Sequence, residues 1–154
     1  MKLYLVRHGH ANEKIVDPER HLSRSGKEEV RNTTFIAAQK YKFEVDMICH
    51  SGKARAEETA EILADTINYS GEIEKVTSLH PLDDPGIWAE KIKTYDQNLM
   101  LVGHSPYMGK MASLLVTGSE NDEIIYFPTA GIACLNQNSD GKWVIEWFSG
   151  SDKF

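Results

Sequence analysis

The sequence has few cysteines, no long apolar run and no excess of positive charge. Two cysteines among 154 residues cannot form the disulfide framework of a small secreted protein, so we expect a reducing, cytoplasmic location. Apolar runs such as Leu3 to Val6 are far shorter than the roughly 20 residues of a membrane-spanning helix. Lys2 is followed by only four apolar residues before Arg7, so no secretory signal is expected. Seventeen Lys and Arg against 23 Asp and Glu give a net charge of −6, which argues against general binding to nucleic acid or anionic membranes.

Linkers, repeats and low-complexity tracts are also missing from the chain. Its 41% apolar and 26% charged residues are an ordinary globular composition. The length suits one domain, because two domains would each be near the lower size limit. We therefore expect a single domain over residues 1–154.

Short apolar runs alternate with amphipathic segments along the chain. The predicted strands are Lys2–Val6, Val45–Cys49, Ile73–Leu79, Leu99–Val102, Ile132–Leu135 and Trp143–Phe148. The predicted helices are Gly26–Tyr41, Ala54–Ile67, Ile87–Tyr95 and a segment from Pro106 to about Val116. Ser25 with Glu28 predicts a capping box at the start of the first helix, and Ser105 predicts an N-cap before Pro106. Strands alternating with helices indicate an α/β fold with a mainly parallel sheet.

Polar residues follow three of the predicted strands, where ligands bind in such sheets. The three segments are Arg7-His8-Gly9-His10, His50-Ser51-Gly52-Lys53-Ala54-Arg55 and Gly103-His104-Ser105-Pro106. If the strands are neighbours, these groups form one cationic pocket in an acidic protein. Arginine forks and imidazoles beside a helix N-terminus suit a phosphate-like dianion.

The residue types in this pocket indicate phosphoryl transfer. A neutral imidazole is a competent nucleophile, and nearby arginines should lower the pKa of His8 and keep it neutral. Gly9 would let the backbone pass close to a ligand. Arg7, Arg55 and His104 can donate to the phosphoryl oxygens, and backbone N–H groups after Ser105 can add further donors.

Four segments, in this order and spacing, resemble the histidine phosphatase (phosphoglycerate-mutase-like) superfamily and its compact SixA-type branch. Arg7-His8-Gly9 resembles the superfamily signature, and Arg20-His21-Leu22-Ser23 with Gly26 resembles the R-P-L-[ST]-x-x-G segment of that branch. Ser51 to Ala60 resembles S-P-x-x-R-A-x-x-T-A, and Leu101 to Pro106 resembles a strand ending in G-H-N-P. The likeness extends through Thr129-Ala130-Gly131-Ile132 and so covers nearly the whole chain.

The resemblance implies a three-layer sandwich with helices on both faces of a mainly parallel sheet. It also implies hydrolysis in two steps through a phosphohistidine, with neither metal nor cofactor. In this scheme His8 is the nucleophile, Arg7 and Arg55 bind the phosphoryl oxygens, and His104 is the second active-site histidine. Arg20 would either reach the rim of the pocket and contact phosphate or form an exposed salt bridge. The implied partner is a phosphorylated protein, such as a phosphorelay or phosphotransfer component, or else a small phosphate ester.

The chain departs from the family pattern at several positions. His10 stands where relatives usually carry Asp or Glu, and its role stays open. Gly52 and His21 replace prolines, and Ser105 replaces a frequent asparagine. The proton for the leaving group could come from Asp84, from His104 or from solvent. A short chain leaves little room for a lid, and an open pocket would suit phosphohistidine on another protein.

Three other hypotheses use the same residues. Cys49 to Arg55 satisfies C-x-x-G-x-x-R, which is similar to the loop of low-molecular-weight cysteine-dependent phosphatases. His8-x-His10 occurs in metal-dependent hydrolases, although the flanking arginines would repel a cation. The pocket could also belong to a non-catalytic phosphate-binding module. His50 and His80 lie outside the matching positions, and we interpret them as structural or exposed.

Overall fold

A computed structural model describes residues 1–150, so the last four positions of the predicted domain 1–154 lie outside the described residues. Its strands are β1 (Lys2–Arg7), β2 (Met47–His50), β3 (Ile73–Lys75), β4 (Leu99–Gly103), β5 (Ile132–Gln137) and β6 (Trp143–Ser149). Its helices are α1 (Arg24–Lys40), α2 (Ala54–Thr66), α3 (Pro85–Lys91), the 3-10 turn η1 (Ile92–Thr94) and α4 (Tyr107–Thr117).

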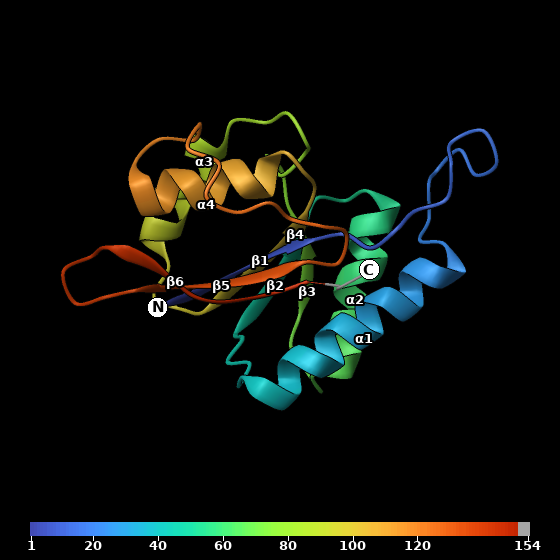
Figure 1. Ribbon diagram of the computed structural model, residues 1–154, viewed down its shortest axis with the longest axis horizontal. Coiled ribbons are helices and arrows are strands. Elements are labelled where there is room, and N and C mark those ends of the chain that lie inside the picture. Colours follow the sequence, from blue (N-terminus) through green and yellow to red (C-terminus); the bar gives the residue numbers. More distant parts are fainter. Residues whose placement is uncertain (151–154) are drawn as a thin grey trace.

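The six strands form one sheet in the order β3-β2-β4-β1-β5-β6. The first four strands are parallel, and β5 and β6 complete the sheet as antiparallel neighbours of β1. Helices α1 and α2 cover one face and α3 and α4 the other (Figure 1). The predicted three-layer α/β arrangement is confirmed, and β1, β2 and β4 end side by side at one edge of the sheet.

Two apolar clusters hold the layers together, one on each face of the sheet. Alternation along β1 sends Tyr4 and Val6 toward α1 and α2, and Leu3 and Leu5 toward α3 and α4. All four side chains are buried, so the end of β1 is fixed from both faces.

Two predicted helix starts are wrong by one or two residues. Ser23, not Ser25, is the N-cap of α1, and its hydroxyl accepts from the backbone N–H of Gly26. The last helix begins at Tyr107 with Pro106 as its N-cap, and Gly118 ends it in the left-handed conformation.

Two other predicted elements are shorter than expected. Strand β3 ends at Lys75, and the following turn places Ser78 at a φ of 66°. This turn directs Leu79 into the core and carries His80 back toward β2. The predicted helix Ile87–Tyr95 is divided into α3, which begins earlier at Pro85, and η1.

Candidate active site

His8 lies at the carboxyl end of β1 and is 8% exposed. Its backbone N–H donates to the Gly103 carbonyl over 2.9 Å, and its carbonyl accepts from Ala130 over 3.0 Å. The ring atom Nδ1 lies 2.7 Å from the Gly9 carbonyl oxygen. Because a carbonyl only accepts, Nδ1 carries the proton in this bond, and the lone pair of the neutral ring is on Nε2.

The surroundings of His8 keep its ring neutral. Burial is the main reason that its pKa falls to about 4, and the charges of Arg55, Arg7 and Arg20 lower it further. The hydrogen bond to Gly9 acts in the opposite direction but does not outweigh them. At pH 7 the imidazole therefore has a free lone pair beside three positive charges.

His104 follows β4 and is fully buried next to His8, with 5.0 Å between the two ring centroids. Its Nε2 lies 2.7 Å from the Ser51 hydroxyl. Burial is the main reason that the pKa of His104 falls to about 2, and electrostatic interactions with His8 and Arg55 lower it further. Its Nδ1 is buried without a hydrogen-bond partner among residues 1–150.

The two expected arginines reach the pocket from β1 and α2. Arg7 donates from Nη1 to the Phe127 carbonyl over 2.8 Å. Arg55 is in the first turn of α2, and burial together with the charge of Arg20 lowers its pKa. Within the described chain, the Nε atoms of both arginines are buried and have no acceptor. Together with His104 Nδ1, three polar atoms without a partner thus belong to residues around His8. Because buried polar groups are normally hydrogen-bonded, these atoms indicate a binding site for a polar ligand.

Thr59 connects the segment that follows β1 to the first turn of α2. Its hydroxyl accepts from the backbone N–H of Gly9 over 3.1 Å and donates to the Arg55 carbonyl over 2.7 Å. The Gly9 carbonyl in turn holds the His8 ring. One buried hydroxyl therefore fixes the spacing between the imidazole of His8 and the helical turn that carries Arg55.

Known proteins of similar sequence and fold share this arrangement of elements. No protein-family model matches the chain. The phosphohistidine phosphatase SixA of Escherichia coli (strain K12) is 25% identical over 153 residues, which is 96% of this chain and 92% of that protein. A SixA structure complexed with tungstate matches with a TM-score of 0.85 at 23% identity, over 97% of each chain. A SixA-type structure from Agrobacterium tumefaciens matches with a TM-score of 0.75 at 26% identity, over 96% of this chain and 95% of the other. The chain is thus similar in sequence and in fold to phosphohistidine phosphatases of the SixA type.

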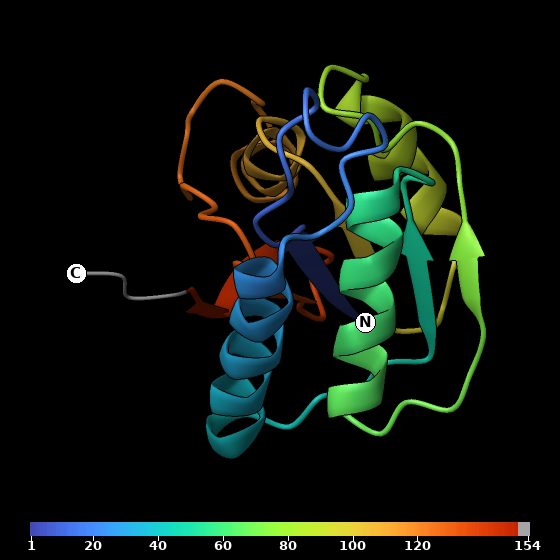
Figure 2. The same cartoon turned by 90° about the vertical axis from the view of Figure 1, so that its right-hand side faces the viewer.

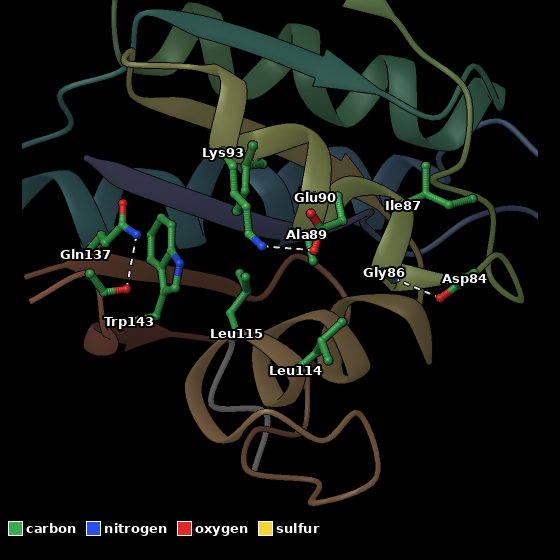
Figure 3. A pocket seen from close by; sticks show the side chains of 12 residues that line it. Asp84, Gly86, Ile87, Ala89, Glu90, Lys93, Leu114, Leu115, Gln137 and Trp143 are labelled. Atoms are coloured by element: carbon green, nitrogen blue, oxygen red, sulfur yellow. Dashed lines mark hydrogen bonds and ion pairs between the residues drawn. The ribbon is translucent and has the colours of Figure 1, made fainter.

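Asp84 lies at the start of α3. Its carboxylate caps that helix by accepting from the Gly86 N–H over 2.8 Å. Figure 3 shows Asp84 at one end of a separate cavity of about 680 Å³ between α3, α4 and the β5–β6 hairpin. No other predicted site residue lines that cavity. The capping bond gives Asp84 a structural role, and its role as general acid stays a prediction.

The remaining predicted residues surround the pocket at different depths. Arg20 is at the rim, where its Nε donates to the Asn12 carbonyl over 3.0 Å while its charge acts on His8 and Arg55. The Gly9 N–H is bonded to Thr59, and a Cβ at Gly9 would lie 2.7 Å from Val30, so this glycine serves close packing against α1. Ser105 lines a second groove of about 400 Å³ beside the pocket.

The side chain of His10 lies beside Ser23, the N-cap of α1. It is exposed, its Nδ1 lies 2.7 Å from the Ser23 hydroxyl, and its carbonyl accepts from the Ser23 N–H over 3.0 Å. His10 thus supports the N-cap of α1.

His80 is a residue of the site that its sequence position did not reveal. Its Nε2 donates to the Ser51 carbonyl over 3.2 Å, and its ring centroid is 6.5 Å from that of His104. His80 is exposed, as expected, but it lies at the pocket mouth. His50 is buried, and its Nδ1 accepts from the Gly52 N–H over 3.0 Å, which is a structural role.

The cysteine-dependent hypothesis lacks an accessible thiolate. Cys49 is buried in the apolar cluster beneath α3 and α4, and burial raises the pKa of its thiol to about 11. Its side chain lies in the core, whereas the His8 ring is in the pocket.

Within residues 1–150 no three His, Cys, Asp or Glu side chains gather as a metal site. No helix among these residues is long and apolar enough to cross a membrane.

Proposed function

We propose that this chain hydrolyses phosphohistidine in proteins, without a metal ion, through a covalent phosphohistidine at His8. The observation that carries the proposal is the His8 ring itself, which is neutral, has its lone pair on Nε2 and lies beside three arginines. One such domain would occupy residues 1–154, in the cytoplasm.

In the first step, His8 Nε2 attacks phosphorus and forms a new N–P bond. The P–N bond of the substrate breaks, its electron pair passes to the leaving imidazole, and that nitrogen takes up one proton. Asp84 caps α3 through one carboxylate oxygen and His104 is uncharged, so we propose solvent as the source of this proton, with Asp84 or His104 as the alternative source. An imidazole leaving group needs less help from an acid than an alkoxide does.

During the transfer, charge on the phosphoryl oxygens is balanced by Arg7, Arg55 and His104. For His104 to donate from Nδ1, its Nε2 must accept the Ser51 hydroxyl proton, so Ser51 would set the tautomer of that ring. Removing one preorganised donor of this kind typically costs about 100- to 1000-fold in rate.

In the second step, water attacks the phosphorus of phosphorylated His8. The N–P bond breaks, its electron pair returns to Nε2, and inorganic phosphate leaves. The protons of the attacking water end on phosphate and in solvent, so the free enzyme is regenerated in its starting state.

The relatives and the shape of the site support a protein substrate. The Escherichia coli relative is a phosphohistidine phosphatase, and the matched SixA structure holds tungstate, an oxyanion that resembles phosphate. A groove of about 750 Å³ with Arg20 and Arg55 in its lining lies beside the pocket. Such a groove can admit a side chain presented by a phosphorelay or phosphotransfer protein.

The test compares turnover of a phosphohistidine-containing protein with turnover of alkyl phosphates. We expect a higher kcat/KM for the phosphohistidine protein, and clear preference for an alkyl phosphate would overturn the substrate proposal. Two matched variants test the nucleophile in the same assay. His8→Ala should abolish turnover and Cys49→Ser should retain it, and the reverse pattern would support the cysteine mechanism.

A further inference from the structure

The most exposed large apolar side chains of the described chain are all in loops. Ile15, Leu82, Tyr126 and Val16 are 90%, 87%, 81% and 80% exposed, whereas the next most exposed, Phe35 on α1, is 59% exposed. Single exposed apolar residues are common on protein surfaces. A group of exposed apolar residues at one edge of the molecule is less common, and it marks a surface for interaction.

A hydrogen bond, a shared groove or a charge interaction connects each of these loops to the phosphate pocket. Ile15 and Val16 are in the loop between β1 and α1, which also carries Arg20, whose charge acts on His8. Leu82 comes two residues after His80, which donates to the Ser51 carbonyl.

Tyr126 joins the same edge from the loop between α4 and β5. It precedes Phe127, whose carbonyl accepts from Arg7, and it lines one groove together with Ser105. Figure 2 views the molecule toward this edge, with the loop after β1 between the loop that precedes α3 and the loop that follows α4. Three loops from distant parts of the chain therefore place apolar side chains around one pocket.

The rim also carries positive charge, although the protein has a net charge of −6. Lys14, Lys53 and Arg20 line the groove of about 750 Å³ beside Arg55. Among the described residues, neither Lys14 nor Lys53 has an ion-pair partner. Glu19, Glu57 and Glu58 share the groove, and two of these three carboxylates have a close partner within the protein. Glu19 lies 3.3 Å from His21, and Glu58 accepts from the Leu22 N–H over 2.8 Å.

We propose that Ile15, Val16, Leu82 and Tyr126 form a docking rim for the protein that carries the phosphohistidine. The partner surface would present apolar side chains around its phosphorylated histidine and acidic side chains toward the two lysines. A small phosphate compound would fill only the pocket, whereas a ligand that contacts all three loops must be broader than the pocket. This inference rests on the proposed function, because it assumes that the pocket binds the phosphoryl group.

The experiment uses the double variant Ile15→Ser/Leu82→Ser, which changes two loops at once. The matched control is Phe35→Ser/Ile36→Ser, which removes two exposed apolar side chains from α1. Each protein is assayed on a phosphohistidine-containing protein and on free phosphohistidine. Free phosphohistidine also reports whether each variant is folded and active.

For the rim variant we expect kcat/KM on the phosphoprotein to fall at least tenfold, mainly through a higher KM. Loss of one apolar anchor weakens binding affinity about fivefold or more, and this variant loses two anchors. Its activity on free phosphohistidine should stay within about twofold of the parent, and the control should match the parent on both substrates. Equal losses in rim and control variants, or no loss on the phosphoprotein, would overturn the docking rim while leaving the phosphatase intact. If the parent acts on neither substrate, the proposed function fails and the docking rim fails with it. Rim-dependent binding to phosphatidylglycerol vesicles, with phosphoprotein turnover unchanged, would overturn it in favour of a lipid surface.

Discussion

Replacing Thr59 by valine tests whether one buried hydroxyl sets the geometry of the catalytic pocket. Thr59 is fully buried, and valine keeps its shape while removing the bonds to the Gly9 N–H and the Arg55 carbonyl. The buried Gly9 N–H would lose its acceptor, which costs about 1 to 3 kcal/mol. For a chain of this size that corresponds to a fall in Tm of roughly 2 to 12 °C.

The same substitution should slow the reaction more than the stability loss alone explains. Gly9 orients His8, and Thr59 ties Gly9 to the turn that carries Arg55. Small misplacements of reacting groups cost up to about 100-fold, so we expect kcat of Thr59→Val to fall by about ten- to 100-fold. Thr59→Ser keeps the hydroxyl and should retain most activity.

The matched control is Thr66→Val on the same helix. Thr66 donates to the Ile62 carbonyl over 2.8 Å within α2, so its hydroxyl lacks the link to β1. Thermal unfolding followed by circular dichroism gives Tm, and steady-state turnover of a small phosphoramidate gives kcat. The positioning role of Thr59 would be refuted if Thr59→Val had the kcat of the parent. It would also be refuted if Thr66→Val lost as much kcat as Thr59→Val.

Three further predictions concern the other groups of the pocket. Ser51→Ala removes the hydroxyl beside His104 Nε2 and should lower kcat about ten- to 100-fold, while the circular dichroism spectrum stays unchanged. An unchanged kcat would contradict the proposal that Ser51 sets the tautomer of the His104 ring. Arg55→Lys keeps the charge but loses the planar fork, so kcat should fall about 100-fold in the same assay, and full activity contradicts bidentate binding of phosphate. The pKa of folded His8 is about 4 against an ordinary 6.5, so between these values the unfolded chain binds a proton that the folded chain does not. The free energy of unfolding of the parent, relative to that of His8→Asn, should therefore decrease as pH falls from 6.5 to 4 in urea unfolding experiments. A difference between the two proteins that does not change with pH would contradict the lowered pKa.

The parts of the site that the sequence predicts are those set by strand ends. His8, Arg55 and His104 each follow or lie close behind a buried apolar strand, and parallel strands deliver their ends to one edge. The apolar runs therefore predict both the sheet and the meeting of these three side chains.

The parts that the sequence does not predict depend on contacts across the fold. Ser23 rather than Ser25 caps α1 because His10, distant along the chain, bonds to Ser23 through its backbone and its ring. His80 reaches Ser51 only because the chain turns after β3. Neither contact leaves a periodic signal in the residues around it.

In the proposed mechanism, His8 is the nucleophile that carries the phosphoryl group between the two steps. The direct measurement is to mix enzyme with a phosphohistidine-containing protein, stop the reaction with alkaline denaturant, and locate the phosphoryl group by mass spectrometry of peptides. We predict a phosphoryl group on His8, attached to Nε2, and none on the His8→Ala variant. A phosphoryl group on Cys49 or His104 instead, or unchanged turnover by His8→Ala, would contradict the mechanism.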